Sequence, residues 1–466
     1  MKYNLLWEIN KLNNSILAID IGTTNIIAIV ASNDFSNKIN ILGVGQSKSE
    51  GVQKGNITDI NLAGNSIKEA VATALNSSGS MINKAIVSIS GANTKTLRGS
   101  GIVNIPSGQI TQNDIKQVLK MALYNAQIIA DYEVIHVLPI FFRVDDGATI
   151  SNPLNMNGAR IEVSVNIITA KKTSLVNVRN ALKQANLEID KFVLSGYANA
   201  ISTLEEDQRK LGSAVINLGG TTTQLVVQKG STILYNYFLP VGSEHITNDI
   251  SVTFHTPYSA ANMIKKQYAT LLPSKESEND NELNIKKVKL PTLGNESESK
   301  EISLDQIQPI LHARVEETLC IIHDKLKESA AIESIDGGIV LTGGMTHIPG
   351  IKELASLIFN NIPVKIANPR NIQNGYINFN TPSMSTIVGL LLYELDSENN
   401  FELDSNSELR QNNTNQMQNN NQMHQQMQNM QHSSTLNDIQ EIKTAKKQEP
   451  SKKGLSGLFD KISRWL

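Results

Sequence analysis

The stretch Ile19-Asp20-Ile21-Gly22-Thr23-Thr24 is followed by the apolar run 26–30, and Ile216-Asn217-Leu218-Gly219-Gly220-Thr221-Thr222 is followed by the apolar run 225–227. The two stretches match if one glycine is inserted. Each has the pattern of a strand, a Gly/Thr turn and a second strand. A unit that recurs so far along the chain predicts two related lobes. Gly-Thr turns are also ordinary hairpin chemistry, so the repeat alone does not establish a function.

The residues around these two stretches have an α/β pattern. The order of strands followed by a helix recurs after residue 214. The sequence therefore predicts an α/β fold with two duplicated lobes between residues 15 and 397. Strands are predicted at 16–21, 26–31, 39–44, 85–90 and 159–169, and helices at 62–75, 112–129, 175–185 and 304–326. Residues 273–302, rich in Ser, Glu and Asn, are predicted to form a surface loop or hairpin within a domain.

Composition narrows the class of protein. The 466 residues carry a formal net charge of −2, which gives no broad basic field for nucleic acid. A single cysteine, Cys320, cannot form an internal disulfide and is typical of a reducing cytosol. Glu8 and Lys11 interrupt the first apolar stretch, so no export signal is expected, and no apolar run approaches the roughly 20 residues of a membrane span.

Two facing Gly/Thr turns suit a nucleoside triphosphate. Glycine lets backbone N–H groups approach phosphate oxygens, and threonine hydroxyls add donors. Asp20, at the end of its strand, is placed to hold Mg²⁺ through water. A third strand runs into the turn Gly343-Gly344-Met345, where a glycine pair allows a flat adenine ring to lie against the backbone.

Two common nucleotide-binding motifs are absent from the sequence. The dipeptide Gly-Lys does not occur, which excludes a Walker A loop. Gly43-x-Gly45 and Gly99-x-Gly101 lack the third glycine of a dinucleotide-binding fingerprint.

The motifs resemble those of the actin/Hsp70 ATPase superfamily. Asp20-Ile-Gly-Thr, Asn217-Leu-Gly-Gly-Thr-Thr and Leu341-Thr-Gly-Gly-Met are similar to its phosphate-1, phosphate-2 and adenosine motifs. Ser195-Gly-Tyr-Ala-Asn-Ala and Thr386-Ile-Val-Gly-Leu-Leu-Leu look like its two connecting helices. Gly51-Val-Gln-Lys-Gly55, Val134-Ile-His-Val-Leu-Pro139 and Phe254-His-Thr-Pro257 resemble, more narrowly, the bacterial cell-division family FtsA.

The resemblance implies an actin-like ATPase fold with an extra subdomain inserted in the first lobe. The implied parts are an N-terminal extension (1–14), subdomain 1A (15–83, 166–207 and 380–397), inserted subdomain 1C (84–165), subdomain 2A (208–244 and 336–379), subdomain 2B (245–335), a disordered Gln/Asn-rich linker (398–450) and an amphipathic membrane-targeting helix (451–466).

The resemblance also implies ATP and Mg²⁺ as cofactors. The residues expected to bind the nucleotide are Asp20, Gly22, Thr23, Thr24, Asn25, Asn217, Gly219, Gly220, Thr221, Thr222, Lys265, Gly343, Gly344 and Met345.

Four positions depart from the family pattern. Asn217 and Gln224 stand where carboxylates are usual, Thr221 replaces a glycine, and Asn262 replaces a ribose-binding Glu. Amides keep hydrogen bonding but lose charge, so weak Mg²⁺ binding and at most weak ATP hydrolysis are expected. Asp20 and Asn217 are the weak candidates for a catalytic role.

The implied function is that of a polymerising adaptor at the cytoplasmic side of the membrane at the division site. It would anchor the tubulin-like ring protein FtsZ, gripping its C-terminal peptide through Arg314 and Glu317, and would help to recruit later division proteins. The alternatives are a pilus-assembly ATPase or another ATPase of the superfamily, such as a sugar kinase or chaperone. A kinase needs an acidic base that has no obvious position here, and a chaperone needs a β-rich domain after 397.

The C-terminal region supplies the membrane prediction. From 411 to 431, 15 of 21 residues are Asn or Gln, too polar to build a core. The last residues put an apolar stripe and a basic surface on one helix, which suits an anionic leaflet. The expected membrane residues are Lys452, Lys453, Leu455, Leu458, Phe459, Lys461, Ile462, Arg464, Trp465 and Leu466. Docking of this helix on the protein's own core is the alternative.

Overall fold

The computed structural model describes residues 15–33, 39–272, 287–370, 372, 379–395 and 401–410. The predicted N-terminal extension, most of the predicted linker and the predicted membrane helix lie outside the described residues.

The first lobe is built on a five-stranded sheet. Its order is β3 (Ile39–Lys48), β2 (Asn25–Asn33), β1 (Ser15–Ile21), β6 (Lys84–Ile89) and β11 (Glu188–Leu194). The first three strands are antiparallel to one another, whereas β6 runs parallel to both β1 and β11. Strand β2 is buried along most of its length and β1 at its centre, as expected for runs of Ile, Val and Ala with helices on both faces.

The second lobe repeats this topology. Its order is β14 (Thr232–Leu239), β13 (Thr223–Lys229), β12 (Ser213–Leu218), β17 (Ile339–Thr342) and β18 (Val364–Ile366). Again three antiparallel strands lead into two parallel ones. The predicted α/β fold with two duplicated lobes is therefore confirmed.

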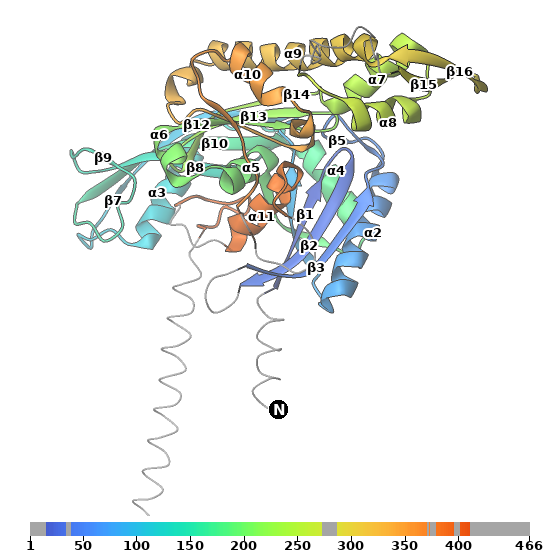
Figure 1. Ribbon diagram of the computed structural model, residues 1–466. Coiled ribbons are helices and arrows are strands. Elements are labelled where there is room, and N and C mark those ends of the chain that lie inside the picture. Colours follow the sequence, from blue (N-terminus) through green and yellow to red (C-terminus); the bar gives the residue numbers. More distant parts are fainter. Residues whose placement is uncertain are drawn as a thin grey trace, which may run out of the picture. The chain divides into compact units, whose positions relative to one another are not determined.

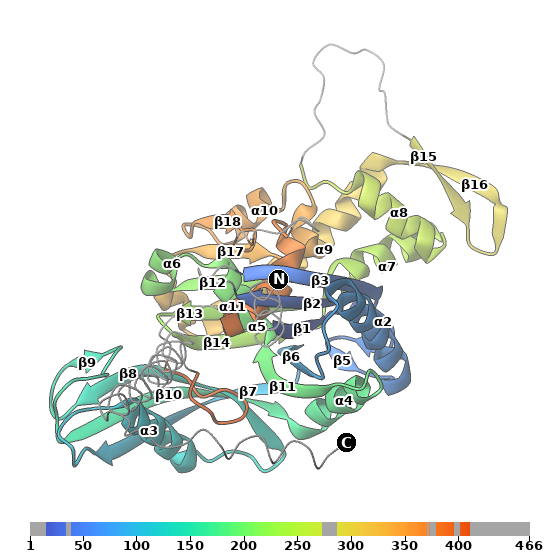
Figure 2. The ribbon, with the colours of Figure 1, turned by 90° about the horizontal axis from the view of Figure 1, so that it is seen from below.

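Helices α5 (Ser195–Thr203) and α11 (Ser385–Leu395) lie at the centre of the molecule, between the two sheets (Figures 1 and 2). Their apolar side chains share one core with residues of both sheets, including Ala18 and Val215. Gly389 brings them close together, because a Cβ there would lie 1.9 Å from the carbonyl oxygen of Ala198. Helices α2 (Ile60–Ser78) and α4 (Lys172–Lys183) pack on the first sheet, as does the small hairpin of β4 (Val52–Gln53) and β5 (Asn56–Ile57).

A separate four-stranded sheet is inserted in the first lobe. Its order is β7 (Thr94–Asn104), β10 (Arg160–Lys171), β8 (Tyr132–Val144) and β9 (Thr149–Ile150), with helix α3 (Gln112–Asn125) packed on β7. The predicted bounds of the insert, 84–165, are wrong at both ends. β6 belongs to the first sheet, because it pairs with β1 and β11, and β10 continues in the inserted sheet to Lys171.

A helical group and a hairpin stand beside the second sheet, at the top of Figure 1. They are α7 (Ser243–Phe254), α8 (Tyr258–Tyr268), the hairpin β15 (Lys287–Thr292) and β16 (Asn295–Ser303), and the long helix α9 (Leu304–Glu328). The hairpin falls within the predicted loop or hairpin at 273–302. The remaining helices are α6 (Glu206–Leu211) and α10 (Ile351–Ile358), with short 3-10 turns at Ala331–Ser334, Gly344–His347 and Pro382–Met384.

The predicted start of the linker at residue 398 is also wrong. Residues 401–410 fold back onto the inserted sheet and the central helices, and Glu402 and Leu403 have no exposed surface. Among the described residues, packed structure therefore reaches Arg410. Composition does not reveal this segment, because it is short and is followed directly by the Asn/Gln-rich tract.

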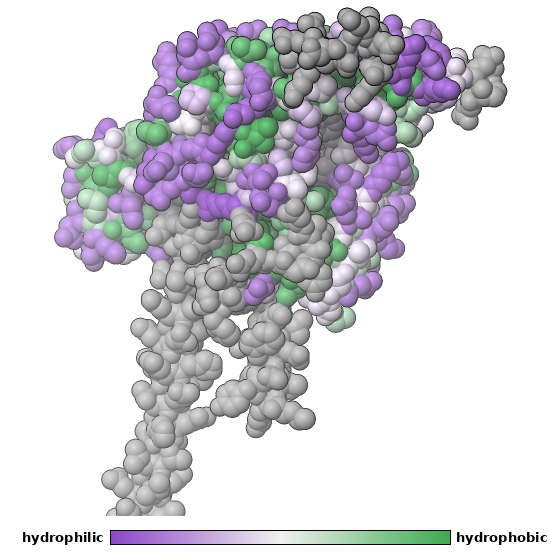
Figure 3. All heavy atoms as spheres, in the orientation of Figure 1, coloured by the Kyte–Doolittle hydropathy of each residue, from purple (hydrophilic) through white to green (hydrophobic). Residues whose placement is uncertain are grey.

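The surface of the described part is mixed. In Figure 3 hydrophobic patches alternate with hydrophilic ones, including over the inserted sheet, where Ile102 and Tyr124 are exposed. Among the described helices, none is both long and apolar enough to cross a membrane.

Buried His136 makes the fold acid-sensitive. Its Nε2 accepts a hydrogen bond from the amide of Leu194, so the ring is neutral, and burial lowers its pKa from 6.5 to about 3. The unfolded chain therefore takes up a proton at this position below pH 6.5 while the folded chain does not, and stability falls as pH drops from 6.5 toward 3. The loss approaches about 1.4 kcal/mol per pH unit.

Denaturant titrations between pH 7 and pH 4 check this expectation. His136→Gln should be less stable at pH 7 but should lose less stability per pH unit than the wild type. Equal slopes for the two proteins would contradict the role of His136.

Candidate functional site: a cavity between two duplicated turns

A cavity of about 1140 Å³ lies where the two lobes meet. The structure brings together on its wall every residue that the sequence analysis expects to bind the nucleotide, namely Asp20, Gly22, Thr23, Thr24, Asn25, Asn217, Gly219, Gly220, Thr221, Thr222, Lys265, Gly343, Gly344 and Met345. These residues come from strands, turns and one helix that lie far apart in the sequence.

The two duplicated turns touch each other at their tips. The turn at 22–24 joins β1 to β2, and the turn at 219–222 joins β12 to β13. The amide of Thr221 donates a hydrogen bond to Thr23 Oγ1 at 3.3 Å. A Cβ on Gly220 would lie 2.2 Å from Cγ2 of Thr24, so glycine is required for this approach. The lobes thus meet through small residues and leave backbone N–H groups near the cavity.

Asp20 supplies a carboxylate on the first-lobe wall of the cavity. The hydroxyl of Ser88, in β6, donates to Asp20 Oδ1 at 2.7 Å and accepts a hydrogen bond from the amide of Ile21. Desolvation raises the pKa of Asp20 to about 6, while the hydrogen bond from Ser88 acts in the opposite direction. A carboxylate whose charge is poorly compensated by the protein suits a bound cation.

The adenosine-type turn follows β17 and lies against Asn217. Gly343 has φ +92°, and a Cβ on it would lie 2.2 Å from Asn217 Oδ1, so only glycine fits there. A Cβ on Gly344 would meet nothing within 4 Å, so the backbone of Gly344 faces open space. This is the arrangement in which a flat ring can lie against the chain.

Lys265, on α8, is held beside the first turn of α7. Its Nζ donates to the backbone carbonyl of Ser243 at 3.0 Å and lies 3.5 Å from Glu244 Oε1. Burial lowers the pKa of Lys265, and the carboxylate of Glu244 opposes that shift.

The chemistry of the wall fits a magnesium nucleotide. Three lysines, Lys48, Lys265 and Lys266, line the cavity and can balance phosphate charge. Three buried polar atoms on the wall, Ser49 Oγ, Thr221 Oγ1 and Asn262 Oδ1, have no hydrogen-bond partner among the described residues. Such atoms cost free energy when left unpaired, and a polar ligand in the cavity would satisfy them.

Sequence reasoning missed several polar residues of this wall. Ser88 contacts Asp20 from another strand, and Ser195, at the start of α5, donates to Gln224 Oε1 at 2.8 Å. Glu244 is the second acidic residue on the wall. None of them stands next to a Gly/Thr turn in the sequence, so only the pairing of distant strands and helices reveals them.

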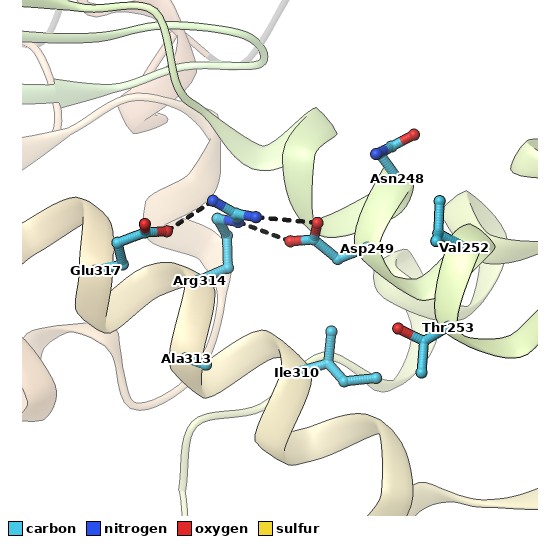
Figure 4. A pocket seen from close by; sticks show the side chains of 8 residues that line it. All are labelled: Asn248, Asp249, Val252, Thr253, Ile310, Ala313, Arg314 and Glu317. Carbon is cyan, nitrogen blue, oxygen red and sulfur yellow. Dashed lines mark hydrogen bonds and ion pairs between the residues drawn. The ribbon is translucent and has the colours of Figure 1, made fainter.

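A second, smaller pocket of about 450 Å³ lies between α7 and α9. Arg314 and Glu317, the predicted partner-binding residues, both line it (Figure 4). The guanidinium of Arg314 donates to both carboxylate oxygens of Asp249, at 2.6 and 3.0 Å, and to Glu317 at 2.6 Å. Arg314 therefore links the two helices, and its guanidinium and two carboxylates make this side of the pocket charged. Exposed Val252 and half-buried Ile310 supply an apolar lining.

The predicted membrane residues, from Lys452 to Leu466, lie outside the described residues, and their role stays a prediction.

Comparisons with known proteins agree with this architecture. Residues 214–389 match the family model described as cell division protein FtsA, and residues 91–169 match the model described as the SHS2 domain inserted in FtsA. The second match coincides with the inserted sheet. Among solved structures, the PilM-PilN type IV pilus biogenesis complex superposes with a TM-score of 0.56 at 15% identity, covering 81% of this chain and 97% of that chain, which shows similarity of fold.

Curated relatives extend the match over most of the chain. The cell division protein FtsA of Helicobacter pylori is 34% identical over 416 residues, covering 83% of each chain. That of Pseudomonas aeruginosa is 30% identical over 385 residues, covering 83% of this chain and 90% of the relative. The fold is an α/β fold of two duplicated lobes with an SHS2 insert, and the chain belongs to the FtsA family of cell division proteins.

Proposed function

We propose that the chain binds ATP with Mg²⁺ between its lobes, self-associates into filaments on the cytoplasmic side of the cell membrane, and anchors FtsZ there during division. The observation that supports nucleotide binding most strongly is the convergence of three glycine turns and Asp20 on one cavity wall. Calorimetric titration with Mg-ATP tests it. One site per chain is expected, and the absence of binding would contradict the proposal.

The cavity residues have distinct roles in this proposal. Backbone N–H groups of the two duplicated turns hold the phosphates, Asp20 holds Mg²⁺ through water, and Gly343 and Gly344 support the base. Mg²⁺ neutralises phosphate charge when bound. Lys265 and Glu244 stand together on the second-lobe side of the cavity, where they can contact the nucleoside.

Weak hydrolysis is expected because Asn217 carries no charge and cannot take a proton from water. Asn217→Asp should tighten Mg²⁺ binding or raise turnover, since it adds a carboxylate opposite Asp20. Phosphate release measured with and without the change checks this, and turnover of the wild type is expected below about 1 s⁻¹. Fast wild-type hydrolysis would contradict the proposed role of Asn217.

The pocket between α7 and α9 is the proposed site for the C-terminal peptide of FtsZ. Arg314→Glu should weaken binding of that peptide at least about tenfold, because it puts negative charge where an interface cation stood. The side chains of Arg314 and Asp249 are only 27% and 23% exposed, so a thermal melt has to accompany the binding measurement to establish that the variant is folded.

A charge-swapped control separates the two roles of Arg314. Arg314→Asp combined with Asp249→Arg restores the ion pair between α7 and α9 but moves the positive charge to the other helix. Peptide binding should stay weak in this double variant. Normal binding by Arg314→Glu, measured by fluorescence anisotropy, would refute the assignment.

The proposed membrane attachment rests on the sequence of residues 451–466, which predicts an amphipathic helix. Anionic inner-membrane lipid, further copies of this chain and later division proteins complete the proposed set of partners. Electron microscopy on a lipid monolayer with ATP should show strings or rings, and persistent monomers would argue against self-association.

A further inference from the structure

Residues 401–410, which we call the clasp, form a short hairpin that pairs with the inserted sheet. Leu403 and Val137, in β8, exchange both backbone hydrogen bonds, at 3.0 and 3.1 Å. Within the clasp, the carboxylate of Asp404 accepts hydrogen bonds from the amides of Asn406 and Glu408, which fixes the turn. The clasp appears as the orange-red loop beside β8 in Figure 2.

Apolar side chains seat the clasp in the core of the insert. Phe401, Leu403 and Leu409 are buried in the same cluster as Phe142, and the rings of Phe401 and Phe142 meet edge to face with centroids 6.1 Å apart. The clasp therefore closes the core of the inserted sheet on the side that faces the central helices.

Buried charge fastens the clasp to the two central helices. Glu402 has no exposed surface, and its Oε2 accepts a hydrogen bond from the hydroxyl of Tyr197, on α5, at 2.7 Å. Arg410 lies 4.3 Å above the ring of Tyr393, on α11, and its Nη1 is 3.9 Å from Glu402 Oε1. His136 Nδ1 lies 4.0 Å from the same carboxylate oxygen.

A second ion pair reinforces this attachment. Lys191, in β11, binds Glu394 on α11 at 2.8 Å and lies 4.0 Å from Asp404 of the clasp.

Removing one member of a buried ion pair leaves an uncompensated charge, which is strongly destabilising. Docking of the clasp therefore depends on Glu402 and Arg410 together.

The same two helices also reach the cavity. Ser195, two residues before Tyr197 on α5, lines the cavity, and so does Thr386, two turns before Tyr393 on α11. On α11 the seven residue steps from Thr386 to Tyr393 span about 10 Å, and on α5 the separation is only two residues, so both helices connect the clasp rigidly to the cavity wall. Their close crossing at Gly389 leaves little room for one to move without the other.

We propose that docking of the clasp holds α5 and α11 in the arrangement that shapes the cavity, so that clasp docking and nucleotide binding favour each other. When the clasp opens, the two helices lose its contacts, and a nucleotide must then order them as it binds. Because the coupling is reciprocal, a bound nucleotide also keeps the clasp closed. The clasp directly precedes the Asn/Gln-rich stretch that begins at residue 411, so the attachment of that stretch to the rest of the chain responds to the cavity. This inference rests on the proposed binding of Mg-ATP.

Hydrogen exchange and calorimetry on the full chain test the inference. Glu402→Gln should speed exchange of the Val137 and Leu403 amides at least about tenfold and weaken Mg-ATP affinity about fivefold or more. Tyr197→Phe removes only the hydroxyl that bonds Glu402. It should also speed exchange of the two amides and weaken Mg-ATP affinity, but by less. In the wild type, Mg-ATP should slow exchange of the same two amides.

Glu408→Gln is the matched control, because it makes the same chemical change in the same hairpin at an exposed side chain that pairs with Lys116. It should alter neither measurement. If Glu402→Gln opens the clasp but leaves the affinity unchanged, or if the clasp stays closed in both Glu402→Gln and Tyr197→Phe, the inference is overturned. If the wild type itself binds no Mg-ATP, the proposed function fails and the inference fails with it.

Discussion

Asp20→Ala is expected to abolish Mg²⁺-dependent binding of ATP. Asp20 supplies the carboxylate on the first-lobe wall of the cavity. The neutral amides and hydroxyls around it carry no net charge and cannot attract a cation as strongly. Desolvation raises the pKa of Asp20 to about 6, so the carboxylate is still mostly ionised at pH 7.5 but destabilises the folded chain relative to the unfolded one. Removing the carboxylate should therefore not unfold the chain.

Calorimetry with ATP, with and without Mg²⁺, measures the effect of this change. Asp146→Ala is the control, since the side chain of Asp146 is almost fully exposed on the insert, and it should bind Mg-ATP as the wild type does. A thermal melt establishes that both variants are folded. Unchanged Mg-ATP affinity in Asp20→Ala would mean that the metal site lies elsewhere.

Deleting Lys452–Leu466 is expected to release the chain from anionic liposomes and to leave ATP binding intact. Six apolar side chains, Leu455, Leu458, Phe459, Ile462, Trp465 and Leu466, fall on one stripe of a helix, with basic residues around them. Full burial would contribute about 1.5–3 kcal/mol for each side chain. This is an upper bound on the free energy of membrane binding, because burial at an interface is partial. One copy should bind reversibly and a filament of copies firmly.

Point changes refine this test. Phe459→Glu with Trp465→Glu should release the chain as the deletion does, whereas Asp460→Asn, which removes the single acidic residue of the segment, should hold it at least as firmly. Sedimentation with liposomes measures all three variants. If the truncated chain still pellets with anionic liposomes, the anchor lies elsewhere.

The sequence predicts the duplicated lobes because each lobe contains a recognisable local pattern. A strand, a Gly/Thr turn and a second strand lie within about a dozen residues, so the turns at 22–24 and 219–222 are visible without any tertiary information. The convergence of these turns on one cavity also agrees with the prediction, because related lobes that face each other bring their equivalent turns together.

Features that depend on long-range pairing escape prediction. Ser88 meets Asp20 because β6 pairs with β1, and nothing near Ser88 in the sequence indicates this. The predicted placement of β6 in the insert is wrong because strand pairing decides which sheet a strand joins, and the pattern within one strand does not reveal its partners. In the sequence, Glu402 and Arg410 stand in a polar stretch typical of a linker. Their contacts with Tyr197 and Tyr393, which lie on distant helices, become visible only in the structure.

Co-sedimentation of FtsZ with anionic liposomes measures whether this chain carries FtsZ to a membrane, as we propose. With the full chain and Mg-ATP present, FtsZ should pellet with the liposomes. Without the chain, or with the chain lacking Lys452–Leu466, it should remain in the supernatant. FtsZ that stays in the supernatant while the full chain itself pellets would contradict the account.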